Sequence, residues 1–259
     1  MDILNKIKKF LDERRSKSNL RWWDRQSKKA ETIDLYDLRE LRTKARQIRN
    51  RANKVNHIAS SRLTLPVIGS KAIKKPQGTE WSHRPEAWAG PVSPTGMSSV
   101  VNKARIGTEL ALFHDCTTSE MTLRQVRNDR EEDLAPFGIQ LDVFNFDGSF
   151  LSLAVEMPQE AVTGLKKEHI IRLALIVDSE RPQEMFARLN LRHGPNTEQI
   201  VRELDLSTRE FYVEFDLFYT NFKEARAESL WLDLIFESPS MNQITIRDVS
   251  VIRRRRANT

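Results

Sequence analysis

Carboxylates, arginines and aromatic rings alternate with apolar residues in several segments of the C-terminal half of this sequence. In the segment 211–219 every odd position is apolar, and Glu214 and Asp216 stand between them. A strand that alternates in this way buries one row of side chains and presents the other to water or to a ligand. The outer rows therefore collect the residues that could do chemistry: Tyr212, Glu214, Asp216, Arg188, Arg192, Trp231 and Asp233.

If these strands shared one sheet, their outer rows would form a surface suited to a sugar. Aromatic rings offer flat apolar contact, and charged groups hydrogen-bond to hydroxyls. An ordinary solvated face would instead pair the arginines with the carboxylates across strands. A glycosidase that used Glu214 or Asp216 with Asp233 would need two carboxyl groups about 5 Å, or about 6.5–9.5 Å, apart. The three interpretations stay open at this point, and we expect a non-catalytic protein.

Other kinds of site lack their sequence patterns. The five histidines form no HxH or HxxxH pair, and the single Cys116 excludes both a disulfide framework and a cysteine-based zinc site. No GxxxxGK or GxGxxG segment is present to hold a phosphate. The sequence therefore predicts no metal site and no cofactor.

The N-terminal segment predicts an amphipathic helix over residues 2–17. Its apolar residues follow helical spacing, and lysines surround them. Such a helix can lie in the interface of an anionic membrane, where tryptophan is also favoured. The predicted contact residues are Ile3, Ile7, Phe10, Leu11, Lys6, Lys8, Lys9, Trp22 and Trp23. Docking on the protein's own body is the alternative.

A second helix is predicted over residues 34–59. Its apolar positions are spaced 3-4-3-4, which is the narrow seam of a coiled coil: Leu38, Leu41, Ala45, Ile48, Ala52 and Val55. Such a seam buries against one partner only, which could be another copy of the chain, a partner helix or the helix over 2–17. The many arginines on its other faces lack the aromatic interleaving typical of nucleic-acid binding, so we expect no nucleic-acid partner.

Charge is distributed unevenly along the chain. Residues 1–60, a basic helical arm, carry 17 Lys or Arg against 8 Asp or Glu, and residues 61–106 carry 7 against 2. Residues 107–252, the predicted β body, carry 14 against 26, and four arginines open a basic tail over 253–259. An anionic partner should therefore meet the arm, unless the arm neutralises the acidic body.

The segment 61–106 holds five prolines and two tryptophans, which predicts an irregular connector wrapped on the β body. No apolar run is long enough to span a membrane, and lysines interrupt the apolar residues at the start, unlike a secretory signal. We therefore expect a cytoplasmic protein, with a peripheral position at the inner membrane face as an alternative.

The β body predicts an antiparallel β-sandwich. The expected strands are Glu109–His114, Thr122–Arg127, Phe137–Phe146, Phe150–Glu156, Ile170–Val177, Met185–Arg192, Phe211–Tyr219, Leu230–Phe236 and Gln243–Ile252. The Asp147-Gly148 pair indicates a hairpin between two of them, and Asn196–Leu204 suits a short helix or a loop. So many strands separated by turns favour two packed sheets over a parallel α/β sheet.

The last expected strand, Ile244–Ile252, resembles the closing strand of jelly-roll carbohydrate-binding modules, and the strand rhythm from Phe137 onward is similar. This resemblance implies a jelly-roll-like sandwich that binds glycans on its concave sheet face or on its edge loops. The whole chain also resembles an uncharacterised bacterial family of unknown function. We expect a sandwich tethered by its basic arm to an anionic surface or a helical partner, with carbohydrate binding, or a carbohydrate-active enzyme, as alternatives.

Overall fold

The computed structural model describes the chain except for residues 1, 64–72, 131–132, 207, 209 and 257–259. Within the two long helices, the side chains of residues 2–13, 16, 50, 53–54 and 56–63 also lie outside the described part. The chain forms two compact units, residues 1–58 and residues 59–259, and each is described by itself.

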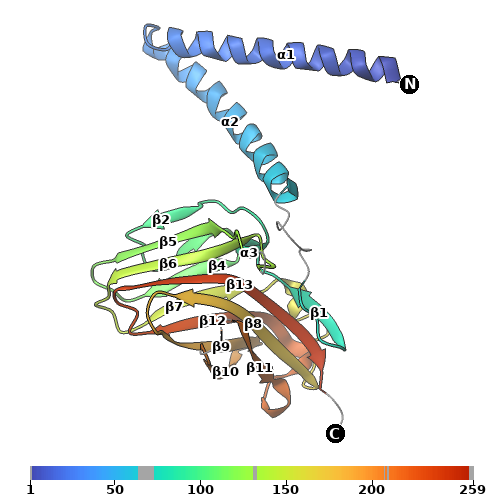
Figure 1. Cartoon of the computed structure of the whole chain (residues 1–259), viewed down its shortest axis with the longest axis vertical. Coiled ribbons are helices and arrows are strands. Elements are labelled where there is room, and N and C mark those ends of the chain that lie inside the picture. Colours follow the sequence, from blue (N-terminus) through green and yellow to red (C-terminus); the bar gives the residue numbers. More distant parts are fainter. Residues whose placement is uncertain (1, 64–72, 131–132, 207, 209, 257–259) are drawn as a thin grey trace. The chain divides into compact units, whose positions relative to one another are not determined.

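The first unit is a helical hairpin of α1 (Asp2–Lys29) and α2 (Leu35–Leu63). Asp34 caps the second helix, because its Oδ1 accepts hydrogen bonds from the backbone N–H groups of Tyr36 at 2.8 Å and Asp37 at 3.0 Å. Figure 1 shows the two helices meeting at this turn. None of the described helices is both long and apolar enough to cross a membrane.

The first helix is longer than its sequence pattern predicts. The apolar stripe ends at Leu11 and the predicted helix at residue 17, yet α1 continues to Lys29. The added segment contains no proline or glycine and holds two Arg and two Lys, which favour helix even without an apolar stripe. The stripe therefore marks where the helix has an apolar face and does not mark where it stops.

The second unit is a mainly β sandwich, as predicted. Its strands are β1 (Thr79–His83), β2 (Gly96–Ser98), β3 (Ala104–Ile106), β4 (Leu110–His114), β5 (Glu120–Arg127), β6 (Phe137–Asn145), β7 (Leu151–Glu156), β8 (His169–Ser179), β9 (Glu184–His193), β10 (Asn196–Leu204), β11 (Glu210–Asp216), β12 (Ala227–Glu237) and β13 (Asn242–Arg255). One short α-helix, α3 (Glu86–Ala89), and three 3₁₀ turns, η1 (Gln159–Ala161), η2 (Leu217–Tyr219) and η3 (Glu224–Arg226), connect them.

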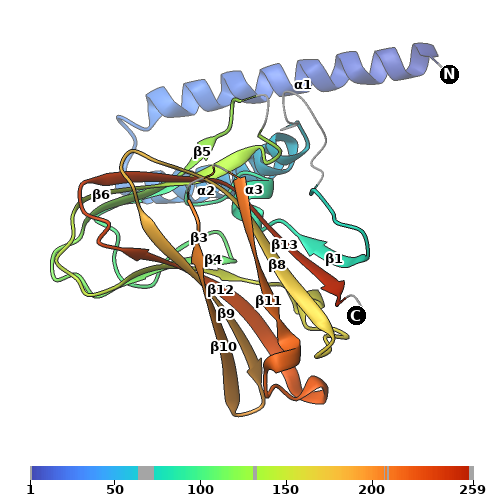
Figure 2. The ribbon, with the colours of Figure 1, turned by 60° about the horizontal axis from the view of Figure 1, so that its bottom comes forward.

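Two antiparallel sheets make up the sandwich. A seven-stranded sheet has the order β11-β8-β13-β6-β5-β2, with β1 also paired to β13, and a six-stranded sheet has the order β10-β9-β12-β7-β4-β3. The chain crosses repeatedly from one sheet to the other, as in a jelly roll. The edge strands β10 and β11 lie side by side at one end of the sandwich (Figure 2).

The core lies between the sheets and follows the predicted alternation. In β12 the even positions Leu230, Leu232, Leu234 and Phe236 are buried, whereas Trp231 and its odd neighbours face outward. Inward residues of both sheets belong to one apolar cluster. In β13 a bulge between Ile246 and Asp248 shifts the phase, so the residues that join the apolar core change from even positions, Ile244 and Ile246, to odd positions, Val249 and Val251.

Three expectations about local structure are wrong. Asn196–Leu204 is a strand, β10, because an edge strand paired only to β9 can be polar on both faces and so shows no clear alternation. The Asp147-Gly148 turn joins β6 to β7, which belong to different sheets, and therefore makes no hairpin. This turn is held by the neighbouring loop instead: Asp147 Oδ1 accepts from Thr117 N at 3.1 Å, and Asp115 Oδ1 accepts from Ser149 N at 2.7 Å.

The third correction concerns the segment 61–106, which is part of the sandwich and so moves its start before residue 107. Strands β1, β2 and β3 and helix α3 come from it, because its prolines flank these elements and do not interrupt them. Trp88 of α3 is fully buried, and its indole N–H donates to the carbonyl of Ile246 at 2.8 Å. Trp81 of β1 is partly buried and packs against the same core.

Candidate functional site

A groove of about 560 Å³ runs over the outer face of the six-stranded sheet. Its floor is made of small outward side chains on β7, Ser152 and Ala154, beside β12. Alternation places Leu151, Leu153 and Val155 in the core, so the positions between them face outward. Because these outward residues are small and those on the neighbouring strands are large, the face is hollowed here.

Aromatic side chains line the groove on both sides of this floor. Trp231 lies on β12, directly opposite Asn190 of β9 and Glu156 of β7. Phe113 of β4 lies opposite Ser152, and Phe150, just before β7, is 44% exposed. These rings offer flat apolar surfaces to a ligand in the groove.

A buried carboxylate lies next to the Trp231 ring in the same strand. Asp233 is only 6% exposed, and its Oδ2 accepts from Arg188 Nη2 at 2.8 Å and Nε at 3.0 Å and from Asn190 Nδ2 at 2.9 Å. Gln199 of β10 donates in turn to Asn190 Oδ1 at 2.9 Å. The three bonds to Asp233 all end on one oxygen, so among the described residues its Oδ1 keeps its hydrogen-bonding capacity for a ligand.

This arrangement combines ring surfaces with fixed polar groups. Hydrogen bonds link the side chains of Gln199, Asn190, Asp233 and Arg188 in that order. Each side chain is therefore held in place before a ligand binds. At the groove's other side, Glu156 accepts from Arg105 Nη1 at 3.0 Å. Such a face can bind a ligand that has both flat apolar patches and hydroxyl or amide groups.

The strands that carry the predicted outer rows do not share one sheet, so the condition for a single surface is not met. Trp231, Asp233 and Arg188 come together in the groove of the six-stranded sheet. Arg192 lies further along β9 and pairs with Glu228 at 3.1 Å. The three remaining residues are on β11 of the other sheet: Tyr212, Glu214 and Asp216. Period-two alternation says which face a residue takes, but it does not say which sheet the strand joins.

On the seven-stranded sheet these residues are engaged by arginines. Glu214 accepts from Arg172 Nε at 2.8 Å and from Arg254 Nη2 at 3.0 Å. Burial raises the pKa of Glu214, but the hydrogen bonds and charges of these two arginines outweigh it, and the pKa is lowered overall. The Arg172 guanidinium also lies 4.0 Å from the centre of the Tyr212 ring. Asp216 accepts from the backbone N–H of Phe218 at 3.0 Å and caps η2.

The groove also contains residues that sequence reasoning missed: Phe113, Phe150, Ser152, Ala154 and Glu156. A signal for the floor was present, because small residues at the outward positions of a buried strand leave room above them. The contribution of Phe113 depends on β4 pairing with β7. Strand pairing is long-range information that no local pattern carries.

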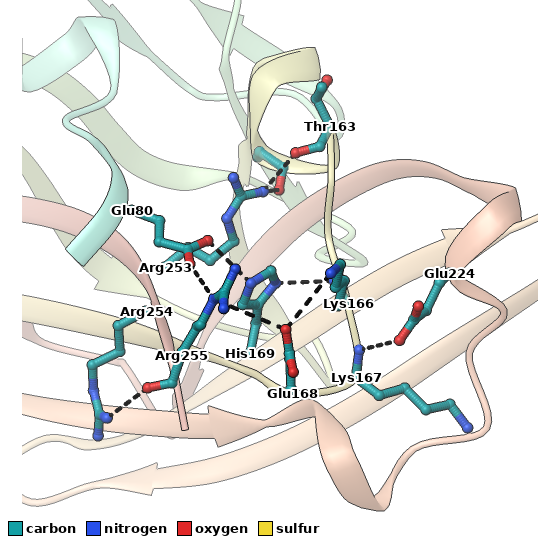
Figure 3. Close-up of polar contacts among 11 residues, drawn as sticks. Glu80, Thr163, Lys166, Lys167, Glu168, His169, Glu224, Arg253, Arg254 and Arg255 are labelled. Carbon is teal, nitrogen blue, oxygen red and sulfur yellow. Dashed lines mark hydrogen bonds and ion pairs between the residues drawn. The ribbon is translucent and has the colours of Figure 1, made fainter. Parts of the chain in front are cut away.

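The first three residues of the predicted basic tail belong to a strand, because β13 continues to Arg255. Arg253 is buried and donates from Nη1 to the carbonyls of Thr163 at 2.8 Å and Ala161 at 3.2 Å. Arg255 Nε donates to Glu80 Oε1 of β1 at 2.6 Å (Figure 3). These arginines hold loops and strands together, so the expected boundary at residue 252 is wrong.

His169 lies buried in the same cluster (Figure 3). The backbone N–H of Lys166 donates to His169 Nδ1 at 2.9 Å, so a neutral ring carries its proton on Nε2, which lies 3.2 Å from Glu80 Oε2. Burial lowers the pKa of His169, and the charge of Arg253 adds to this, whereas Glu80 acts in the opposite direction.

In the helical unit, the predicted membrane contacts Ile3, Lys6, Ile7, Lys8, Lys9, Phe10 and Leu11 have side chains outside the described part. Trp22 is exposed, whereas Trp23 lines an apolar groove of about 260 Å³ between α1 and α2. Leu38, Leu41 and Ala45 line the same groove. Membrane contact of the arm, a coiled coil and a cytoplasmic location stay predictions.

Solved structures similar to this chain are mainly carbohydrate-binding modules. The family 11 module of the cellulase Lic26A-Cel5E of Clostridium thermocellum has 8% identity and a TM-score of 0.37 over 61% of this chain and 96% of that one. TmCBM61 in complex with β-1,4-galactotriose has 14% identity and a TM-score of 0.34 over 57% and 88%. The two antiparallel sheets of this chain and its repeated crossings between them agree with the jelly-roll-like sandwich that the sequence resemblance implies.

The enzymatically active domain of the bacteriophage CBA120 tailspike protein 4 has 9% identity and a TM-score of 0.40. That similarity covers 60% of this chain but only 21% of the tailspike chain. No curated protein matches the sequence. A family model matches residues 3–259, and the chain belongs to that family, DUF6478, a family of unknown function.

Proposed function

We propose that the groove of the six-stranded sheet binds a carbohydrate chain without cleaving it. One observation carries the proposal: a buried carboxylate, Asp233, is held on one oxygen by Arg188 and Asn190 next to the Trp231 ring in an open groove. A sugar ring has an apolar face for the indole and hydroxyls for the fixed carboxylate and guanidinium.

Burying the polar cluster around Asp233 contributes little to the stability of the fold. A buried ion pair adds little to stability compared with apolar residues of similar volume. The groove floor is also built from small residues, Ser152 and Ala154, which leave open space where a ligand would lie. A ligand that contacts Trp231 and Asp233 together accounts for both features.

The proposal is one of binding alone because both carboxylates that line the groove are engaged by arginines. Asp233 is bound to Arg188, and Glu156 is bound to Arg105. A glycosidase needs two carboxyl groups placed to act on the scissile bond, whereas both carboxylates here are occupied by arginines. We therefore expect binding without release of reducing sugar.

The experiment uses the full chain against soluble polysaccharides built from glucose, xylose and galactose, with affinity measured by calorimetry. The test variant is Ala154→Phe, which fills the groove floor from an outward position without entering the core. The matched control is Ala174→Phe, an outward alanine in β8 of the other sheet.

We expect binding by the wild-type chain and by Ala174→Phe, and its loss in Ala154→Phe. A reducing-sugar assay on the same samples should stay at background. If no polysaccharide binds, or if Ala154→Phe and Ala174→Phe lose binding equally, the groove is not a carbohydrate site.

A further inference from the structure

The apolar seam of α2 continues past the groove between the two helices as an uncovered strip. Leu38 and Leu41 are half-buried beside Trp23, near the turn. Beyond Ala45 the seam opens to solvent, with Ile48 45% and Val55 67% exposed. An exposed apolar row on a helix is typical of a surface that another element covers.

The width of this strip indicates what covers it. Helices that lie in a membrane interface present a broad apolar face, whereas coiled-coil helices present a narrow row with a 3-4 spacing. The seam of α2 is of the narrow kind. It therefore suits a second helix better than a lipid surface, and a flexible polyanion would leave the apolar row uncovered.

The residues that flank the seam identify the charge of the partner. With Leu38 at position a of a heptad, positions e and g of the two heptads 38–44 and 45–51 hold Arg42, Lys44, Arg49 and Arg51. All four are exposed, and only Lys44 has a carboxylate partner among the described residues, Glu40 at 3.7 Å. Residues at e and g face the flanks of a partner helix and decide which helix pairs with which.

A second copy of α2 would place like charges side by side. Pairing with α1 has a similar cost, because α1 carries more lysines and arginines than carboxylates. An acidic helix has the opposite charges at the same positions. We propose that α2 docks an amphipathic helix of a partner protein that has apolar residues at a and d and Glu or Asp at e and g.

The test uses the full chain and a labelled synthetic peptide of about four heptads with Ile at a, Leu at d and Glu at e and g. Fluorescence anisotropy measures its binding. A scrambled peptide of the same composition keeps the charge but loses the stripe. Vesicles of phosphatidylglycerol present the membrane alternative in a parallel sedimentation assay.

Two double variants separate the seam from the general charge of the arm. Arg42→Glu with Arg49→Glu reverses charges beside the seam, whereas Arg39→Glu with Arg46→Glu makes the same change at positions b, away from it. We expect the first pair to weaken peptide binding at least about tenfold and the second about twofold or less. The first variant should also gain affinity for a version of the peptide with Lys at e and g.

Far-ultraviolet circular dichroism checks that each variant keeps its helices. The proposal is overturned if the peptide does not bind, if the scrambled peptide binds equally well, or if both double variants weaken binding alike. Vesicle sedimentation without peptide binding would assign the arm to membranes instead. None of these outcomes bears on the groove of the six-stranded sheet, which is tested with polysaccharides.

Discussion

The outer faces of the two sheets carry similar residue types but engage them differently. On the seven-stranded sheet, Tyr212 is covered by Arg172, and Glu214 is held by two arginines. On the six-stranded sheet, no guanidinium of the described residues covers the Trp231 ring. Among the described residues, the hydrogen bonds to Asp233 there all end on one oxygen.

The difference follows from the residues on the neighbouring strands. Beside Glu214, the strands β8 and β13 supply Arg172 and Arg254 in adjacent rows, so the face closes on itself with ion pairs. Beside Asp233, β9 supplies one arginine and β7 supplies Ala154. The same alternation of charged and aromatic residues thus gives a face closed by its own ion pairs on the seven-stranded sheet and an open groove on the six-stranded sheet.

The largest expected effect is on ligand affinity. Trp231→Ala should weaken polysaccharide binding about thirtyfold or more, the loss of about 2 kcal/mol typical of a central aromatic anchor. Tyr212→Ala should change it less than about twofold, because that ring lies on the other sheet under Arg172. Calorimetry with the best-binding polysaccharide measures both. Equal losses would show that the two faces do not differ in function.

The next effect concerns stability. Arg188→Leu should cost about 2–3 kcal/mol, because it leaves the buried Asp233 without the arginine that pairs with it. Arg172→Leu should cost about 1 kcal/mol or less, since Glu214 is more exposed and keeps Arg254. Urea unfolding measures both. A larger loss for Arg172→Leu than for Arg188→Leu would reverse the comparison between the faces.

The sequence predicted more of the fold than of the candidate site. Strands with a buried row and a polar row, such as β12, show their period in the sequence, and this alone favours a sandwich. The bulge in β13 is also visible, because the apolar residues change from Ile246 to Val249, an odd step. The edge strand β10 and the short strand β1 carry no such period. β10 pairs with β9, which directly precedes it in the sequence, whereas β1 pairs with the distant strand β13.

For the site, the sequence predicted that Trp231, Asp233 and Arg188 face outward, but it also assigned Tyr212 and Glu214 to the same surface. The local period of two in the sequence contains no information about which strands are neighbours in a sheet. The contributions of Phe113 and Phe150 depend on β4 lying beside β7 and on the turn before β7. Such contacts are set by the long-range topology, which the alternation does not encode.

A third effect tests the ion pairs of the seven-stranded face through pH. The pKa of Glu214 is lowered in the fold, so the unfolded chain binds the proton first as pH falls below about 4.5. Stability contributed by Glu214 is therefore present above this range and is lost as pH falls through the folded pKa. Glu214→Gln should be less stable than the wild type by about 1 kcal/mol at pH 7.

The difference between Glu214→Gln and the wild type should shrink toward pH 3. Unfolding midpoints in urea at pH 7, 5 and 3 measure it. A difference that stays constant over this range would show that the arginines contribute by packing and not by charge. Polysaccharide affinity near neutral pH should be the same in this variant, because Glu214 is not in the groove.

The smallest effect involves His169, at the start of β8. Its pKa is lowered by burial, so below about pH 6.5 the unfolded chain takes up a proton that the folded chain resists. Stability should therefore fall as pH drops through this range and level off below the folded pKa. His169→Asn keeps an acceptor near the position of Nδ1 for the Lys166 N–H but does not titrate.

The variant should remove that slope between pH 7.5 and 5.5 while leaving polysaccharide affinity unchanged, since His169 belongs to the seven-stranded sheet. Thermal unfolding over this pH range, followed by circular dichroism, measures the slope. A wild-type chain that gains stability on acidification would mean that the Glu80 carboxylate at 3.2 Å outweighs burial. Even then, the pH dependence of stability and the affinity for polysaccharide could be varied separately, because His169 lies in the seven-stranded sheet and the groove lies on the six-stranded sheet.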